Sequence, residues 1–189
     1  MSADRFTDWV GEAIVSLPQQ MKAMLRVVDD PEVADQGRVF AAGALLHVLV
    51  ASNAIPGMRG ILAYVDDVLV IKLVLERLCV SDAEAMSAHR ESSPELFSGL
   101  EDHMESAREY LGELLTLVDK AVDDLPKLQH QGHTPGQCVH DTDGGNWLYD
   151  IVHEAIVEQF EFDEDEVYRE IKRIDQIRTS LRSRVTTPK

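Results

Sequence analysis

The sequence predicts an all-α fold, a compact bundle of about six to seven helices with one long irregular loop rich in Gly and His. Apolar residues recur at spacings of three and four, the period of an amphipathic helix. The segment richest in branched residues has no partner strands elsewhere in the chain, which argues against a sheet. Prolines divide the chain into intervals of helical length, at Pro18, Pro31, Pro56, Pro94, Pro126 and Pro135.

Length and composition indicate one globular domain, or one domain with an appendage. The chain has 189 residues and a mass of 21.1 kDa, with 44% hydrophobic and 28% charged residues. A chain of this size buries roughly 70% of the surface that its unfolded form exposes. We therefore expect it to fold without disulfides.

The first half of the chain supplies the predicted core. Pro18 and Pro31 suit the first turns of new helices, where the missing N–H group costs nothing. The segment 39–52 is almost wholly apolar, which predicts a central helix buried on most sides, with His47 as a core histidine. The preceding segment 3–16 has an apolar helical face, made of Phe6, Trp9, Val10, Ala13 and Ile14.

The segment 61–80 predicts a second core helix. A fully buried strand is the alternative because 68–75 is rich in branched residues, but the length of the segment favours a helix. A further helix is expected from Pro94 to about residue 123, with Ser93 as its N-cap.

The segment 130–146 differs in kind from the rest. It holds four of the eleven glycines, three histidines and one cysteine, so we expect no regular element in it. Asn146 is expected to cap the next helix, and the acidic run 161–166 to begin the last one. The chain thus divides into a helical core (1–129), the irregular loop (130–146) and C-terminal helices that pack on the core or on a partner (147–189).

Charge and cysteine content exclude several classes of protein. Eighteen basic against thirty-four acidic residues give a net charge of −16, which argues against nucleic acid or an anionic membrane as a partner. The longest apolar run, 39–50, is shorter than the roughly 20 residues of a membrane-spanning helix. With two cysteines and no apolar signal core at the N-terminus, the chain is expected to be cytoplasmic.

The C-terminal segment carries a net positive charge, whereas the rest of the chain is negatively charged. Residues 169–189 hold seven basic and two acidic residues, so they carry +5 and the remainder carries −21. This segment either docks on its own acidic body or binds a protein partner or a second copy of the chain. Its apolar seam, interrupted by Arg178, consists of Val167, Ile171, Ile174, Leu181 and Val185.

Candidate metal ligands cluster in the irregular loop. His130, His133, Cys138 and His140 follow one another in the pattern His-x2-His-x4-Cys-x-His. Zinc takes nitrogen and sulfur ligands in a tetrahedron, and metal binding would order a glycine-rich loop. The sequence therefore predicts zinc at these four residues. The alternative is a mobile surface loop in which histidines happen to cluster, because the spacing matches no standard zinc ribbon or finger.

Two pairs of residues form a second-choice polar cluster. Asp66 and Asp67 stand at the start of a very apolar helix, where one could face solvent and the other could cap a neighbouring helix or pair with Arg59. His153 and Glu154 open like a zinc-protease helix, but the second histidine of that motif is absent.

The segment 53–70 resembles the signature of the YkvA-like family of bacterial helical proteins of unassigned function. The family pattern is Asp-Leu-Ile-Pro-Asp, an apolar stretch, and Gly-Tyr-Leu-Asp-Asp before an apolar helix. Asn53, Gly57 and Ala63 depart from it. The resemblance covers about a tenth of the chain and implies an all-helical core but no reaction. The matching residues are Ile55, Pro56, Tyr64, Asp66 and Asp67.

The leading function is a non-enzymatic cytoplasmic regulatory or scaffold protein, with zinc ordering the loop. No nucleophile motif or phosphate-binding loop is present. The alternative is a metal-dependent hydrolase that uses the same loop ligands, with Asp141, Asp143 or Glu154 as general base. A helical interaction module without metal is a third possibility.

Overall fold

The computed structural model describes residues 2–50 and 54–186, and these residues are almost entirely helical. Residues 51–52, the end of the predicted central helix, lie outside the described residues. Asn53, the first residue of the YkvA-like segment, lies outside them too. The α-helices of the described residues are α1 (Ser2–Val15), α2 (Leu17–Asp29), α3 (Asp35–Leu49), α4 (Tyr64–Ser81), α5 (Ala83–Ser92), α6 (Pro94–Phe97), α7 (Leu100–Leu111), α8 (Leu115–Asp124), α9 (Pro135–His140), α10 (Thr142–Glu158), α11 (Glu164–Glu170) and α12 (Asp175–Thr186). Short 3-10 turns join some of them, namely η1 (Gly60–Ala63), η2 (Gly112–Leu114), η3 (Leu125–Lys127) and η4 (Ile171–Arg173).

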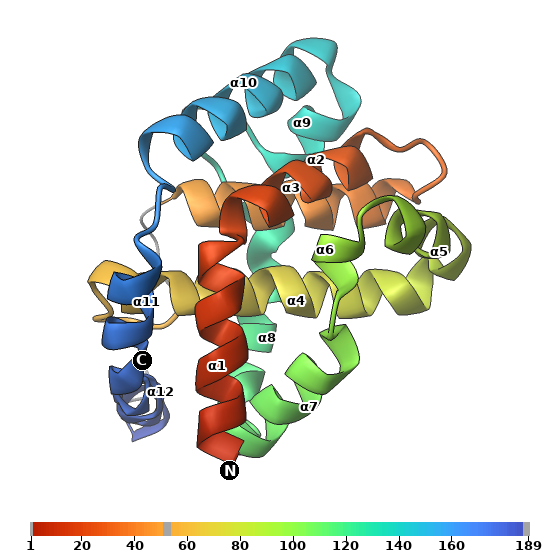
Figure 1. Cartoon of the computed structure of the whole chain (residues 1–189). Helices are drawn as coiled ribbons and strands as arrows, with labels where there is room; N and C mark the ends of the chain where they lie inside the picture. The colour runs from red at the N-terminus through yellow and green to blue at the C-terminus, as the bar shows by residue number, and fades with distance from the viewer. Residues whose placement is uncertain (1, 51–53, 187–189) are drawn as a thin grey trace.

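The all-α class is confirmed, and the core lies around the two segments that the sequence singled out. Helices α3 and α4 run side by side in opposite directions through the middle of the molecule (Figure 1). Helix α1 crosses in front, α2, α9 and α10 cover α3, and α7 and α8 pack on α4 (Figure 1). Because both central helices are buried on most sides, they carry apolar residues all round rather than in one stripe.

The described residues form more helices than predicted, and two of the additional helices arise because the expected helix from Pro94 to about 123 is broken twice. The chain adopts a left-handed conformation at Gly99 (φ +64°), and Gly112 also has a positive φ of +56°. Glycine reaches such angles without a steric penalty, whereas a helix requires negative φ. The predicted start of the helix was correct, since Pro94 begins α6 directly after Ser93.

The predicted irregular loop at 130–146 is not confirmed. After a tight turn at 130–133, Thr134 begins a capping box in which its hydroxyl accepts from the Gln137 backbone N–H, and the Gln137 side chain accepts from the Thr134 N–H. Pro135 then starts α9, and α10 begins at Thr142, four residues before the predicted cap at Asn146. Gly144 instead allows α9 and α10 to approach closely, since a Cβ on it would lie 2.8 Å from the Gln137 carbonyl carbon and closer still to its oxygen.

The C-terminal helices dock on the rest of the chain. Tyr110 on α7 donates a hydrogen bond to Asp175 at 2.7 Å. On α12, the guanidinium of Arg184 donates to the Ala54 carbonyl at 2.8 Å, and the Ser180 hydroxyl donates to the Pro56 carbonyl. Of the predicted apolar seam, Val185 is exposed, and the buried members are Val167, Ile171, Ile174 and Leu181.

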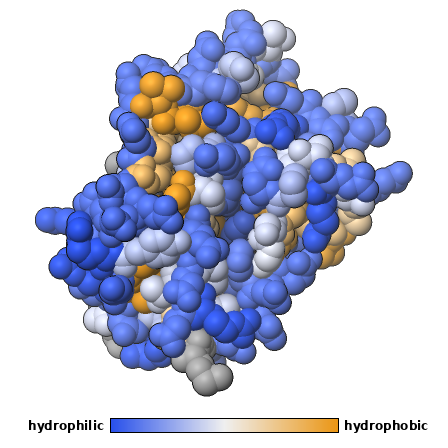
Figure 2. Space-filling model, viewed as in Figure 1, coloured by the Kyte–Doolittle hydropathy of each residue, from blue (hydrophilic) through white to orange (hydrophobic). Residues whose placement is uncertain are grey.

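The surface facing the viewer in Figure 2 is mostly hydrophilic. Hydrophobic atoms gather in that view over the C-terminal half of α10, where Val157 is 78% exposed. Within the described ranges, none of the helices combines the length and the apolar character that crossing a bilayer requires. The division of the chain at residues 129 and 146 stays a prediction.

Candidate functional site

The most unusual polar group in the core joins the end of α3 to the start of α4. His47 lies in the last turn of α3, and Asp66 and Asp67 lie in the first turn of α4. Since α3 and α4 are antiparallel, the end of one helix faces the beginning of the next (Figure 1). A helix N-terminus stabilises carboxylates and a helix C-terminus stabilises an imidazole, so both kinds of side chain suit their positions.

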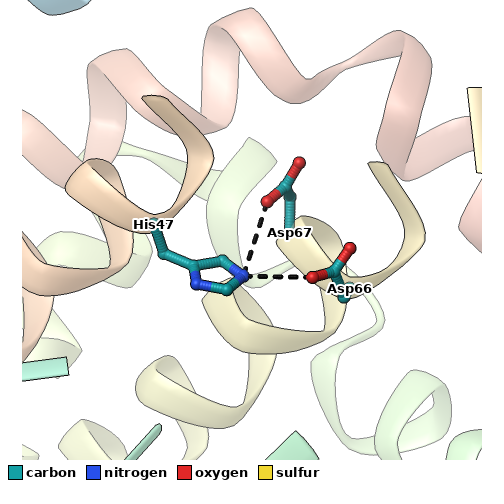
Figure 3. A group of neighbouring side chains, drawn as sticks. All are labelled: His47, Asp66 and Asp67. Carbon is teal, nitrogen blue, oxygen red and sulfur yellow. Dashed lines mark hydrogen bonds and ion pairs between the residues drawn. The ribbon is translucent and has the colours of Figure 1, made fainter. Parts of the chain in front are cut away.

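One ring nitrogen of His47 faces both carboxylates (Figure 3). Its Nε2 lies 3.2 Å from Asp66 Oδ2 and 3.6 Å from Asp67 Oδ1. A single N–H can hydrogen-bond Asp66 at this distance, but 3.6 Å is too long for a hydrogen bond to Asp67. The histidine therefore satisfies one of the two carboxylates.

Both carboxylates are removed from water. Asp66 is fully buried, and its Oδ2 also accepts a hydrogen bond from the Ala54 backbone N–H at 2.5 Å. Its Oδ1 has no hydrogen-bond partner among the described residues. A buried oxygen without a partner is energetically costly, and a bound ion is one way to offset that cost.

The electrostatics of the pair are unfavourable without a cation. Burial raises the pKa of Asp67 well above its ordinary value of 3.8, and the neighbouring Asp66 carboxylate raises it further. The pKa of Tyr64 is also raised, by burial and by the charge of Asp67. Two buried carboxylates side by side repel each other unless a proton or a cation lies between them.

This cluster meets the geometric requirement for a metal site. One ligand atom from each of His47, Asp66 and Asp67 lies within 4.8 Å of the others, and among the described residues no other group of three such side chains does so. The expectation that one aspartate faces solvent while the other caps a neighbouring helix or pairs with Arg59 is wrong in its first part, because both carboxylates are buried beside His47.

The predicted zinc ligands of the 130–146 segment are not brought together in this way. The backbones of His130 and His133 pair with each other, and the His133 ring stacks on Trp147 with centroids 4.1 Å apart. Cys138 is buried, and burial raises the pKa of its thiol to about 11, whereas zinc binds the thiolate. His140 is exposed. Zinc binding by these residues stays a prediction.

Only two of the four residues in the second-choice cluster lie in this site. Asp66 and Asp67 belong to the site, but His153 and Glu154 lie on α10 and join no such group among the described residues. His153 Nδ1 lies 2.8 Å from the Tyr149 carbonyl oxygen of its own helix. The residue that sequence reasoning missed is His47, and the available signal was an imidazole near the end of one apolar helix and paired acids near the start of the next.

Comparison with known proteins adds no identification, since no family model, curated protein or solved structure matches this chain.

Proposed function

We propose that this chain is a metal-binding helical protein that holds a divalent cation with His47, Asp66 and Asp67. The observation that carries the proposal is the convergence of one imidazole nitrogen and two carboxylate oxygens in the protein core. Imidazole and carboxylate ligands together suit zinc, iron and manganese.

The spacing of the ligand atoms supports a cation of the size of zinc. Two ligands at about 2.1 Å from a tetrahedral ion lie about 3.4 Å apart. The distances from His47 Nε2 to the two carboxylates, 3.2 and 3.6 Å, bracket this value. Two of the three distances between ligand atoms therefore suit such an ion, and the third, between the two carboxylates, is within 4.8 Å.

Charge and hydrogen bonding support the same conclusion. A dication between two carboxylates brings the net charge of the buried group to zero, so that the two carboxylates no longer repel each other without compensation. It would also give Asp67 the partner that the His47 N–H is too distant to supply. Such an ion would link α3 to α4, in keeping with a non-enzymatic regulatory or scaffold role.

The test is the metal content of untagged protein after zinc loading and removal of free metal. We expect about one equivalent in the wild type and loss of the metal in His47→Gln and Asp67→Asn. Asp67→Asn is the cleaner variant, because the Asp67 carboxylate accepts no backbone hydrogen bond in the described part of the chain, whereas Asp66 accepts one from Ala54.

Two control variants show whether the metal lies at this cluster or elsewhere in the chain. His89→Gln removes a buried histidine that contacts a single carboxylate, Asp30, at 2.8 Å, and it should keep its metal. The double variant Cys138→Ala, His140→Gln should keep it too. Loss of metal in this double variant alone would place zinc in the 130–146 segment, and a metal-free wild type would leave the cluster as a hydrogen-bonded clamp. Either result overturns the proposal.

The C-terminal helix is the expected place of contact with other proteins. A protein partner or self-association through this helix remains our proposal, with the exposed Val185 as the free part of the seam. The test is the mass of the protein in solution by light scattering, comparing the wild type with Val185→Lys.

A further inference from the structure

A cavity of about 310 Å³ adjoins the cluster. It lies where the end of α3, the η1 turn and the residues just after α10 meet, and Asp67 belongs both to its wall and to the metal cluster. Besides Asp67, its described lining consists of Val48, Leu49, Val50, Gly60, Ala63, Tyr64, Gln159 and Phe160.

We infer that the cation keeps one coordination position open toward this cavity, and that a small uncharged molecule with an oxygen donor, such as an amide, binds there. This inference rests on the proposed metal site. It adds a ligand-binding function to what would otherwise be a purely structural ion.

The number of protein ligands leaves a coordination position free. Structural zinc sites are closed by four protein ligands, whereas sites with three protein ligands leave the fourth position to water or to a substrate. Among the described residues, the cluster offers three ligand side chains and no fourth. Because Asp67 both lines the cavity and would bind the ion, the ion would lie within the length of the Asp67 side chain of the cavity wall.

The chemistry of the cavity wall favours a neutral molecule. Its described lining contains neither Lys nor Arg, and its one charged residue, Asp67, is engaged by the cation. Phosphate and other anions are bound mainly by cationic side chains, which this wall lacks. The first turn of α4, which borders the cavity, already holds the two acidic residues Asp66 and Asp67. Tyr64 and Gln159 can hydrogen-bond a neutral polar molecule, and the remaining side chains are apolar.

The size of the cavity limits the ligand. Ligand pockets of proteins range from about 300 to 1,000 Å³, so this cavity stands at the small end of the range and fits a small ligand. The expected ligand is therefore small, uncharged and able to place an oxygen on the metal.

The experiment uses the full chain loaded with Co²⁺, whose visible spectrum reports its coordination. Acetamide, which is uncharged at neutral pH, and inorganic phosphate are titrated separately. We expect a saturable spectral change with acetamide and none with phosphate. Ala63→Leu, which fills the cavity without removing a metal ligand, should weaken the response about tenfold or more, equal to about 1.4 kcal/mol. The control is Ala83→Leu on α5, outside the cavity lining.

The outcomes distinguish the two proposals. Failure to bind Co²⁺ refutes the metal site itself. Co²⁺ binding with a spectrum that neither ligand changes refutes the open position and leaves the metal site intact. A change with phosphate instead refutes the ligand class, and an equal response in Ala63→Leu refutes the cavity as the binding place.

Discussion

Lys72 offers the sharpest test of the energetics of the core. It lies in the middle of α4, is 2% exposed, and donates a hydrogen bond to the Leu96 carbonyl at 2.9 Å. No carboxylate among the described residues lies within ion-pair distance of its ammonium group. Burial lowers the pKa of Lys72 from 10.5 to about 8. At neutral pH the folded protein therefore holds a charge in an environment that opposes it.

The cost follows from the pKa. A fall from 10.5 to about 8 corresponds to about 3 kcal/mol of destabilisation at pH 7. In Lys72→Met this cost disappears, but the Leu96 carbonyl loses its donor, at about 1 kcal/mol. We therefore expect the variant to be about 2 kcal/mol more stable than the wild type at pH 7.

The pH dependence separates the charge from every other effect of the substitution. Because the folded-state pKa lies below the unfolded value, the folded protein binds fewer protons, and the wild type gains stability as the pH rises from about 8 to 10.5. At pH 10 about 1 kcal/mol of the cost remains, so the two proteins should be nearly equal in stability.

The measurement is urea denaturation at pH 7 and pH 10 for the wild type, Lys72→Met and the control Lys120→Met, whose side chain is exposed on α8. A stability difference between wild type and Lys72→Met that is the same at both pH values would refute the reasoning. As a second readout, the pKa of His103 should rise in Lys72→Met, since burial and the charge of Lys72 both lower it.

Three further predictions concern helix contacts and the metal site. Gly144→Ala should destabilise the protein by about 1–3 kcal/mol in urea denaturation, because its Cβ would lie 2.8 Å from the Gln137 carbonyl carbon. Gly136→Ala, whose Cβ meets nothing within 4 Å, should be neutral or stabilising; equal effects in the two glycine variants would contradict the close contact of α9 and α10. Tyr110→Phe should cost about 1 kcal/mol by removing the 2.7 Å hydrogen bond to Asp175, and should have no effect in an Asp175→Ala background. Chelation of the zinc-loaded wild type should lower its melting temperature, since a ligand at a hundred times its Kd adds about 2.7 kcal/mol, and the same treatment of His47→Gln should change nothing.

The sequence predicted the fold class and the central helices because hydrophobic periodicity reports burial directly. The segments 39–52 and 61–80 are apolar and long enough to favour buried helices over buried strands, and their described residues lie mainly in α3 and α4. Local signals were harder to weigh. Gly99 and Gly112 gave no sign that they would take positive φ, since glycine is also tolerated within helices.

Two errors have different physical origins, one in local structure and one in the tertiary fold. In the 130–146 segment, the glycines and histidines suggested an irregular loop, but the capping box of Thr134 and Gln137 was the decisive local signal. His47 was classed as an ordinary core residue because a single apolar helix reveals nothing about its neighbour. Its pairing with Asp66 and Asp67 depends on the antiparallel arrangement of α3 and α4, which is a property of the tertiary fold.

The hydrogen bonds of α12 couple the docking of this helix to the cluster of His47, Asp66 and Asp67. Arg184 binds the carbonyl group of Ala54, and the N–H of the same residue binds Asp66, so one peptide segment joins the C-terminal helix to the cluster. By thermodynamic linkage, if cation binding stabilises the docking of α12, then the docking of α12 increases the affinity for the cation by the same free energy. Fusions and affinity tags therefore belong at the N-terminus, away from α12. Slower proteolytic removal of α12 in the presence of metal would show that the metal site is occupied.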